Sequence, residues 1–294
     1  MSNRVDHVHG ESLASDVVTV AAVQMVSGPN VMENLQTASE LVASAVEKGA
    51  SIVALPEYFC LLSPQENAKL SHAEQQGVGP IQACMAALAR RHGIWLCAGT
   101  LPLQSPDPAR VHNTSFMYGP DGRQVARYDK IHLFRYTGDS EQFDEGRTIL
   151  AGDLPVSVDC SMSTTNAPGL PGEFSLRVGL SVCYDLRFPE LYRMMGAVDL
   201  ILVPSAFTYT TGRAHWEVLL KARAIENQCY VLAPAQGGIH PHGRHTWGHS
   251  MLIDPWGEII AEQAQGPGVI VGQLSLSTLR RVRQSLPALE NRLL

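Results

Sequence analysis

Three reactive side chains each stand where a strand-like stretch of the chain ends. These are Glu57, Lys130 and Cys183. A carboxylate can accept a proton, an ammonium can stabilise a developing negative charge, and a thiol can attack a carbonyl carbon. Each also has a plainer interpretation, because a lone cysteine in an apolar run is usually a core thiol and a charged loop residue is usually solvated. Gaps of 73 and 53 residues do not by themselves decide whether the three meet.

The elements that would position these residues follow from the pattern of apolar residues. Nearly continuous apolar runs, typical of strands buried on both faces, occupy residues 17–23, 51–55, 94–99, 177–182, 200–203 and 230–235. Helical periodicity marks residues 31–45, 81–91, 215–228 and 276–283. Turn signals predict hairpins at residues 119–122 and 254–257, and a polar surface loop is expected at 161–172. The alternation predicts an α/β fold, in which reactive groups gather at the ends of strands.

Composition excludes several classes of protein. The chain has 294 residues, of which 45% are hydrophobic and 17% charged, so wholesale disorder is excluded. Its net charge of −6 excludes a strongly basic nucleic-acid-binding surface. No stretch reaches the roughly 18 unbroken apolar residues that a membrane helix needs. We therefore expect neither nucleic acid nor a membrane among the partners of this protein.

The cysteine pattern and the first residues bear on location and domain organisation. Six cysteines without a CxxC pair favour a reducing, cytoplasmic location over a disulfide scaffold. Residues 1–16 are polar and lack the apolar core of a secretory signal, so a flexible N-terminal extension is expected there. No linker divides the rest, and residues 17–294 are predicted to form one domain. We expect no metal site in the histidine-bearing segment at residues 240–249, because no acid or cysteine joins the imidazoles there.

Taken together and in order, the three stretches resemble the signature motifs of the nitrilase superfamily, the carbon–nitrogen hydrolases with a Glu-Lys-Cys triad. They read LPE at residues 55–57, DKIHLF at 129–134 and VCYDLRFPE at 182–190. The resemblance runs from about residue 19 to the C-terminus. It implies a four-layer α-β-β-α sandwich and hydrolysis of carbon–nitrogen bonds other than peptide bonds, with no cofactor.

The resemblance also implies a role for each residue of the triad. Cys183 is expected to be the nucleophile, carried at the tip of a tight turn, and Glu57 the general base. Lys130 is expected to stabilise the oxyanion, together with the backbone N–H of Tyr184. A lysine between two carboxylates would stay charged, as this role requires.

Further site residues are less sharply defined by the sequence. A second glutamate usually follows the lysine motif in this family, and Glu145 is assigned to that place, with Glu141 as the alternative. A carboxylate-bearing substrate needs a cationic partner, for which Arg187 and Arg213 are candidates. Arg187 can equally be a structural ion-pair partner behind the turn that carries the thiol.

Residues 204–256 resemble most closely the branch of the family that acts on deaminated glutathione. Ser205 stands where the related ω-amidases typically carry glycine, while AQGG at 235–238 departs from the AQCG of some members. The branch implies a small α-keto-acid amide as substrate. The alternatives are an ω-amidase for 2-oxoglutaramate-like substrates, a broad aliphatic amidase, a nitrile hydrolase, and a non-catalytic thiol redox sensor. The family commonly pairs, so a homodimer or a higher homo-oligomer is expected, with the helix at 276–283 assisting.

Overall fold

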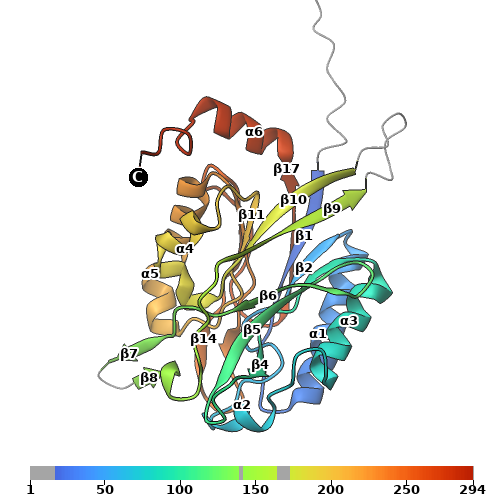
Figure 1. Ribbon diagram of the computed structural model, residues 1–294, viewed down its shortest axis with the longest axis vertical. Helices are drawn as coiled ribbons and strands as arrows, with labels where there is room; N and C mark the ends of the chain where they lie inside the picture. Colours follow the sequence, from blue (N-terminus) through green and yellow to red (C-terminus); the bar gives the residue numbers. More distant parts are fainter. Residues whose placement is uncertain (1–16, 139–141, 164–172, 294) are drawn as a thin grey trace, which may run out of the picture.

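Two sheets packed face to face form the centre of the computed structural model, and each carries helices on its outer face (Figure 1). The structure describes residues 17–138, 142–163 and 173–293. The extension predicted for residues 1–16 lies outside the described residues, and its boundary with the domain stays a prediction. The predicted α-β-β-α sandwich is confirmed: one helical layer, two sheets and a second helical layer follow one another across the molecule.

The first sheet combines parallel strands from the N-terminal half with antiparallel strands at its edges. Its strands are β1 (Val17–Gln24), β2 (Ile52–Ala54), β3 (Trp95–Cys97), β4 (Leu101–Gln104), β5 (Val111–Tyr118), β6 (Gln124–Asp129) and β17 (Gly268–Ser275). β1, β2 and β3 run parallel, so their carboxyl ends meet at one edge. The outer face is covered by α1 (Val31–Glu47) and α3 (Pro80–His92).

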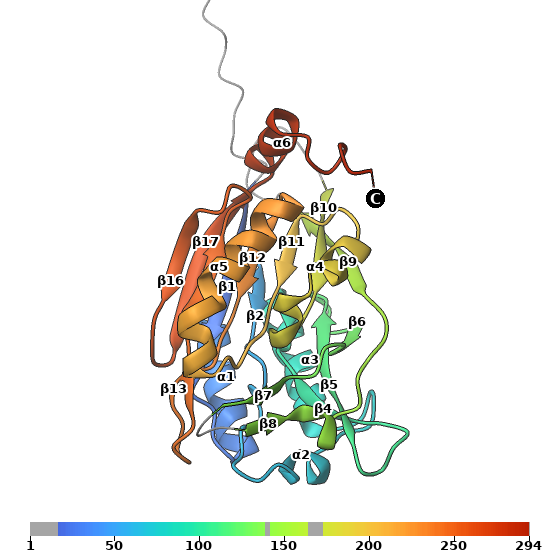
Figure 2. The same cartoon turned by 90° about the vertical axis from the view of Figure 1, so that its left-hand side faces the viewer.

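The second sheet repeats this plan. Its strands are β9 (Val156–Ser163), β10 (Glu173–Leu180), β11 (Leu200–Leu202), β12 (Tyr230–Ala233), β15 (Ser250–Ile253) and β16 (Ile259–Gln263). β10, β11 and β12 run parallel. Figure 2 shows α4 (Pro189–Met194) and α5 (Tyr209–Asn227) lying across this sheet. Helix α6 (Leu276–Ser285) lies at the end of the molecule beyond both sheets in the two views.

Smaller elements surround one end of the sandwich. They are α2 (Ala68–Ser71), the ribbon of β7 (Arg135–Thr137) with β8 (Gln142–Asp144), the ribbon of β13 (Gly237–Ile239) with β14 (His245–Trp247), and the 3-10 helices η2 (Glu145–Arg147) and η3 (Cys183–Arg187). The patterns of apolar residues that predict the helices and strands did not predict these two ribbons. Among the described residues, no helix is long and apolar enough to cross a membrane.

The apolar runs of the sequence reflect burial on both faces of each strand. In β1, Val20 and Ala22 pack into the core between the two sheets, whereas Ala21 and Val23 pack under the helices α1 and α3. Side chains alternate between the faces of a strand, so a strand buried on both faces must be apolar throughout. This explains why the central strands could be recognised without any alternating pattern.

Helix α1 begins at Val31, where the sequence predicts it. The side chain of Asn30 accepts hydrogen bonds from the N–H groups of Met32 and Glu33, and its own amide donates to the Glu33 carboxylate. These bonds satisfy N–H groups that would otherwise lack a partner in the first turn.

Two sequence expectations need correction. The long helix begins at Tyr209 and not near residue 215, because the side chain of Thr208 accepts from Thr211 N and caps it there. Gly212 lies inside this helix, and the residue is glycine because a Cβ at that position would collide with the side chain of Trp247. The loop expected at 161–172 is in part strand, since β9 extends to residue 163, and the remainder lies outside the described residues.

Candidate active site

Chain segments from both sheets converge at one end of the sandwich and bring the sequence-predicted residues together. Glu57 follows β2, Lys130 follows β6, and Cys183 follows β10. Glu145 begins the 3-10 helix η2, directly after β8. Parallel strands place their carboxyl ends at the same edge, so the loops after β2 and β10 approach each other across the two packed sheets.

Lys130 is the centre of the arrangement and is fully buried. Its Nζ atom donates to Glu57 Oε1 at 2.9 Å and to Glu145 Oε2 at 2.8 Å. Its backbone is fixed as well, because its N–H donates to Asn113 O and its carbonyl accepts from Gly152 N. An ammonium group has three N–H donors, so one is left without a side-chain acceptor among the described residues.

Glu57 is held by donors from three separate parts of the chain. Its Oε1 atom accepts from Asn113 Nδ2 at 3.0 Å as well as from Lys130, and its Oε2 atom accepts from Ala206 N at 3.0 Å. The Cys183 thiol lies close enough to this carboxyl group for each to influence the pKa of the other. The carboxylate is therefore oriented toward the thiol by contacts that none of its sequence neighbours supplies.

Glu145 is fixed just as closely on the other side of the lysine. Its Oε1 atom accepts from the Tyr58 hydroxyl at 2.7 Å, and its Oε2 atom accepts from Phe134 N at 2.7 Å. Glu145 therefore occupies the place predicted for the second glutamate, beside Lys130. The alternative, Glu141, lies outside the described residues.

Cys183 stands at a sharp bend between β10 and a helical turn. Its φ angle is +50°, a left-handed conformation that costs a non-glycine residue about 1–3 kcal/mol. Its N–H donates to Pro204 O, and its side chain is only 7% exposed. Asp185 N donates to Val182 O, whereas Tyr184 N–H has no acceptor within the described part of the chain. This N–H belongs to the first turn of η3, where unpaired donors can bind an anion.

A buried aspartate clamps this bend, and sequence analysis gave it no role. Asp185 Oδ2 accepts from Val182 N at 2.8 Å and from the Tyr128 hydroxyl at 2.7 Å. Its Oδ1 atom accepts from His132 N at 3.0 Å and is 2.7 Å from His132 Nδ1. The His132 ring in turn stacks on Phe188 at 3.7 Å between centroids. Asp185 thus ties the lysine segment to the cysteine segment. The sequence signal for this role is the position of Asp185, a carboxylate that stands two residues after the thiol at the end of an apolar run.

Burial and charge shift the pKa values of the two glutamates in opposite directions. Burial raises the pKa of Glu57 above its ordinary 4.5, and the nearby Lys130 only partly opposes this. Burial acts in the same sense on Glu145, but Lys130 and the bonds from Phe134 and Tyr58 outweigh it, so the pKa of Glu145 is lowered. Glu57 is therefore the carboxylate with the greater affinity for a proton.

The lysine and the thiol complete the electrostatics of the site. Burial alone would lower the pKa of Lys130, but Glu145 and Glu57 raise it well above its ordinary value, so the ammonium stays charged. Burial, reinforced by Glu57, raises the pKa of the Cys183 thiol well above its ordinary value. The thiol is therefore protonated at neutral pH, and attack on a substrate requires a base that takes this proton.

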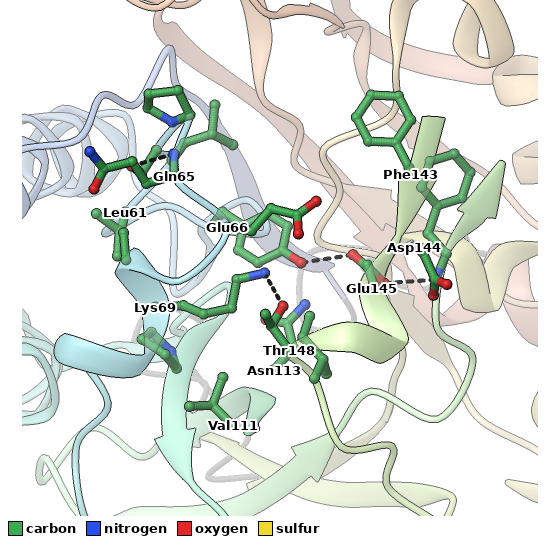
Figure 3. Close-up of a pocket in the computed structure, with 18 of the residues that line it drawn as sticks. Leu61, Gln65, Glu66, Lys69, Val111, Asn113, Phe143, Asp144, Glu145 and Thr148 are labelled. Atoms are coloured by element: carbon green, nitrogen blue, oxygen red, sulfur yellow. Dashed lines mark hydrogen bonds between the residues drawn. The ribbon is translucent and has the colours of Figure 1, made fainter. Parts of the chain in front are cut away.

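Two cavities adjoin these residues. The smaller, of about 20 Å³, lies against Cys183 and is bordered by Tyr184, Arg187 and Phe207. The larger, of about 360 Å³, is the pocket of Figure 3 and reaches from Glu145 and Asn113 to α2. Tyr58, Phe134, Glu145 and Arg244 border both cavities. The two cavities therefore adjoin each other, with these four residues in their common wall.

The two predicted substrate-binding arginines have different positions. Arg187 lines the small cavity, and its guanidinium lies over the rings of Tyr184 and Phe207. Its Nη1 atom is 3.2 Å from His215 Nδ1, so the guanidinium contacts ring systems and a histidine. Arg213 is exposed and lines a separate depression beside α5, so the structure does not bring it to Cys183.

Among the described residues, no three His, Cys, Asp or Glu side chains gather to hold a metal ion. In the histidine-bearing segment, His240 is buried and contacts Ser27 O and Thr246 Oγ1, both at 2.8 Å. Its imidazole therefore connects the β13–β14 ribbon to the loop after β1.

Comparisons with known proteins agree on one family. The family model described as carbon-nitrogen hydrolase matches residues 19–284. The deaminated glutathione amidase of Synechocystis sp. is 42% identical over 276 residues, covering 92% of this chain and 97% of that protein.

Solved structures agree with this result. The Caenorhabditis elegans NitFhit protein superposes with a TM-score of 0.81 and 36% identity over 95% of this chain, which spans 66% of that longer chain. Saccharomyces cerevisiae Nit3, described as a member of branch 10 of the nitrilase superfamily, has a TM-score of 0.80 and 28% identity, with 94% and 97% of the two chains covered. The resemblance drawn from the motifs is thus confirmed along almost the whole chain: this protein belongs to the carbon–nitrogen hydrolase family of the nitrilase superfamily, as an amidase acting on bonds other than peptide bonds.

Proposed function

We propose that this amidase hydrolyses a small α-keto-acid amide, with deaminated glutathione as its substrate, through a thioester on Cys183. The observation that carries the chemistry is that a protonated thiol and a proton-accepting carboxylate, Cys183 and Glu57, line one cavity, while the charged Lys130 is hydrogen-bonded directly to Glu57. The 42% identity to a deaminated glutathione amidase supports the choice of substrate.

In the first step, Glu57 takes the proton of Cys183 while the sulfur attacks the amide carbon. The raised pKa of Glu57 suits it to this task, because a base with a very low pKa would not accept a proton from a thiol. The carbonyl oxygen becomes an oxyanion, and two donors are available to it: the third N–H of Lys130 and the backbone N–H of Tyr184. Glu145 raises the pKa of Lys130 and so keeps the lysine protonated.

In the second step, the carbon–nitrogen bond breaks and the amine leaves with the proton carried by Glu57. The acyl group remains on Cys183 as a thioester. A water molecule then gives its proton to Glu57 and attacks the thioester carbon, after which the thiol recovers the proton as it leaves. The net reaction consumes one water and yields a carboxylic acid and an amine, and it requires no metal or redox partner.

Turnover of deaminated glutathione tests the proposal directly. The purified protein is expected to release 2-oxoglutarate and cysteinylglycine in equal amounts, and Cys183→Ala is expected to abolish release while leaving the circular dichroism spectrum unchanged. A Cys183→Ala variant that retains most of the activity would show the proposed mechanism to be wrong.

The same assay separates the rival functions. Faster turnover of 2-oxoglutaramate than of deaminated glutathione would identify an ω-amidase instead, and comparable turnover of simple amides would identify a broad aliphatic amidase. A thiol redox sensor would hydrolyse none of them and would be oxidised by peroxide at Cys183. The paired Glu57 and Lys130 argue against the sensor, because oxidation of a thiol needs no oxyanion donor.

We also propose that the protein forms a homodimer and acts in the cytoplasm. Support for pairing comes from apolar side chains exposed beside α5, namely Val218, Ile225 and Trp256, since such residues commonly lie at interfaces. Support for the location comes from six unpaired cysteines. Light scattering at micromolar concentration tests the first proposal, and a monomer would contradict it.

A further inference from the structure

Two cationic side chains that the proposed chemistry does not use line the larger cavity. Lys69 and Arg244 both line it, and neither forms an ion pair within the described part of the chain. Of the acidic side chains that line this cavity, Glu145 is already bound to Lys130, and neither Glu66 nor Asp144 forms an ion pair with Lys69 or Arg244 within the described residues. Cations that are partly withdrawn from water without a carboxylate partner are costly, so proteins seldom keep them without a use.

Lys69 reaches from α2 to the wall of the cavity (Figure 3). Its Nζ atom donates to the neutral hydroxyl of Thr148 at 2.9 Å, and this is its one hydrogen bond among the described residues. Burial lowers the pKa of Lys69, opposed by the more distant Glu145 and Glu66, while the positive charges of Lys130 and Arg244 act with the burial. The ammonium therefore has N–H donors left for a ligand.

Arg244 stands where the two cavities meet, on the turn between β13 and β14. Its Nε atom is buried and has no hydrogen-bond partner within the described residues. The guanidinium lies 5.3 Å from the centre of the Phe143 ring, a contact that holds the side chain but satisfies no N–H donor. A buried donor without an acceptor is rare and points to a ligand that supplies one.

Cavity size decides which part of a substrate meets these cations. About 20 Å³ beside Cys183 holds little more than a water-sized group, whereas about 360 Å³ falls within the range of small-molecule sites. The reacting amide can occupy the small cavity only if the rest of the molecule lies in the large one. Arg244 borders both spaces, and Lys69 borders only the larger.

We propose that Arg244 and Lys69 form a carboxylate-binding subsite that selects amides with an anionic tail. Arg244 binds a carboxylate close to the reacting carbonyl, and Lys69 binds negative charge farther along the same molecule. This inference rests on the proposed amidase function and adds what recognises the acid. It replaces Arg213, the exposed candidate from the sequence, with two cations that line the cavity.

Matched pairs of substrates test the subsite without relying on deaminated glutathione. Each pair consists of an ω-amide acid, from glutaramate to suberamate, and the neutral diamide of the same length. The wild-type enzyme is expected to have a higher kcat/KM for the acid, whereas Arg244→Met and Lys69→Met are expected to reduce this preference by about 10- to 100-fold. That factor corresponds to the loss of one charge-assisted hydrogen bond, and it is expected in KM more than in kcat.

Two exposed cations supply controls with the same change in net charge. Arg123→Gln and Lys48→Gln remove charges outside both cavities and are expected to leave the preference unchanged. Thermal unfolding of each variant shows whether it is folded. The subsite is refuted if the wild type prefers the diamides, or if both cavity variants lose activity equally on acid and diamide. A wild type that prefers acids but does not hydrolyse deaminated glutathione refutes the proposed substrate alone.

Discussion

Replacing Asp185 by asparagine exchanges one carboxylate oxygen for an NH₂ group and is expected to disable the bend that carries the thiol. Each carboxylate oxygen accepts one backbone N–H, from Val182 on one side and from His132 on the other. An amide side chain has a single acceptor oxygen, so in either orientation its NH₂ group faces one of these N–H donors. The Tyr128 hydroxyl can rotate to accept, but a backbone N–H cannot.

The expected loss follows from these contacts. One buried backbone N–H without an acceptor costs about 1–3 kcal/mol, and the remaining bonds lose their charge assistance at about 1 kcal/mol. We expect Asp185→Asn to lower the free energy of unfolding by about 2–4 kcal/mol. Once the clamp is weakened, the left-handed Cys183 can relax, and a shift of about 1 Å in the sulfur lowers kcat by about 100-fold.

Urea unfolding and steady-state kinetics measure the two effects in one preparation. The control is Asp153→Asn, an exposed aspartate, for which we expect a change of less than about 0.5 kcal/mol and normal turnover. Because Asp185 positions the thiol and does not transfer the proton, the acid limb of the pH profile should keep its midpoint. An Asp185→Asn variant with wild-type stability and more than half of the wild-type kcat would refute this reasoning.

Three further predictions concern the titrating groups. The proposed mechanism needs ionised Glu57, so the acid limb of kcat/KM should have its midpoint above 4.5, and a midpoint at or below that value would contradict the role of burial. Since the pKa of Glu145 is lowered, its contribution to the free energy of unfolding is present above pH 4.5 and is lost as the pH falls through the lower, folded-state pKa. Glu145→Gln should abolish this loss in acid unfolding. It should also lower kcat, because Glu145 raises the pKa of Lys130 and so keeps the ammonium protonated. Burial lowers the pKa of His240 to about 4, so nuclear magnetic resonance should detect no titration of this imidazole between pH 5 and 8, and a midpoint near 6.5 would show that the ring is solvated.

The strands and the order of the motifs could be predicted because they depend on local patterns. A strand buried on both faces is apolar throughout, so β1, β11 and β12 could be recognised from seven or fewer residues each. The start of α5 could not be found in this way. Three threonines and Gly212 resemble a turn, and only the close approach of Trp247 explains why glycine lies within a helix.

The partners of the proposed catalytic residues could not be predicted, because they come from distant segments. Asn113 lies on β5 and Ala206 in the loop after β11, yet both donate to the carboxylate of Glu57. Nothing in either local sequence indicates this contact. For the same reason the sequence does not distinguish Arg213 from Arg244 by position, although only Arg244 borders both cavities.

Net charge explains how one buried cluster can hold two carboxylates and still carry out the proposed reaction. With both Glu57 and Glu145 ionised around Lys130, the cluster has a net charge of −1 and a neutral thiol beside it. When the proton moves from sulfur to Glu57 and the sulfur attacks, the negative charge leaves Glu57 and appears on the substrate oxygen. The total stays at −1, so the site need not draw a charge from solvent into a low-dielectric interior. The reaction therefore requires a second carboxylate with a raised pKa, which is Glu57. A site with only Glu145 and Lys130 would begin with a net charge of zero and would have to form a thiolate, which burial disfavours.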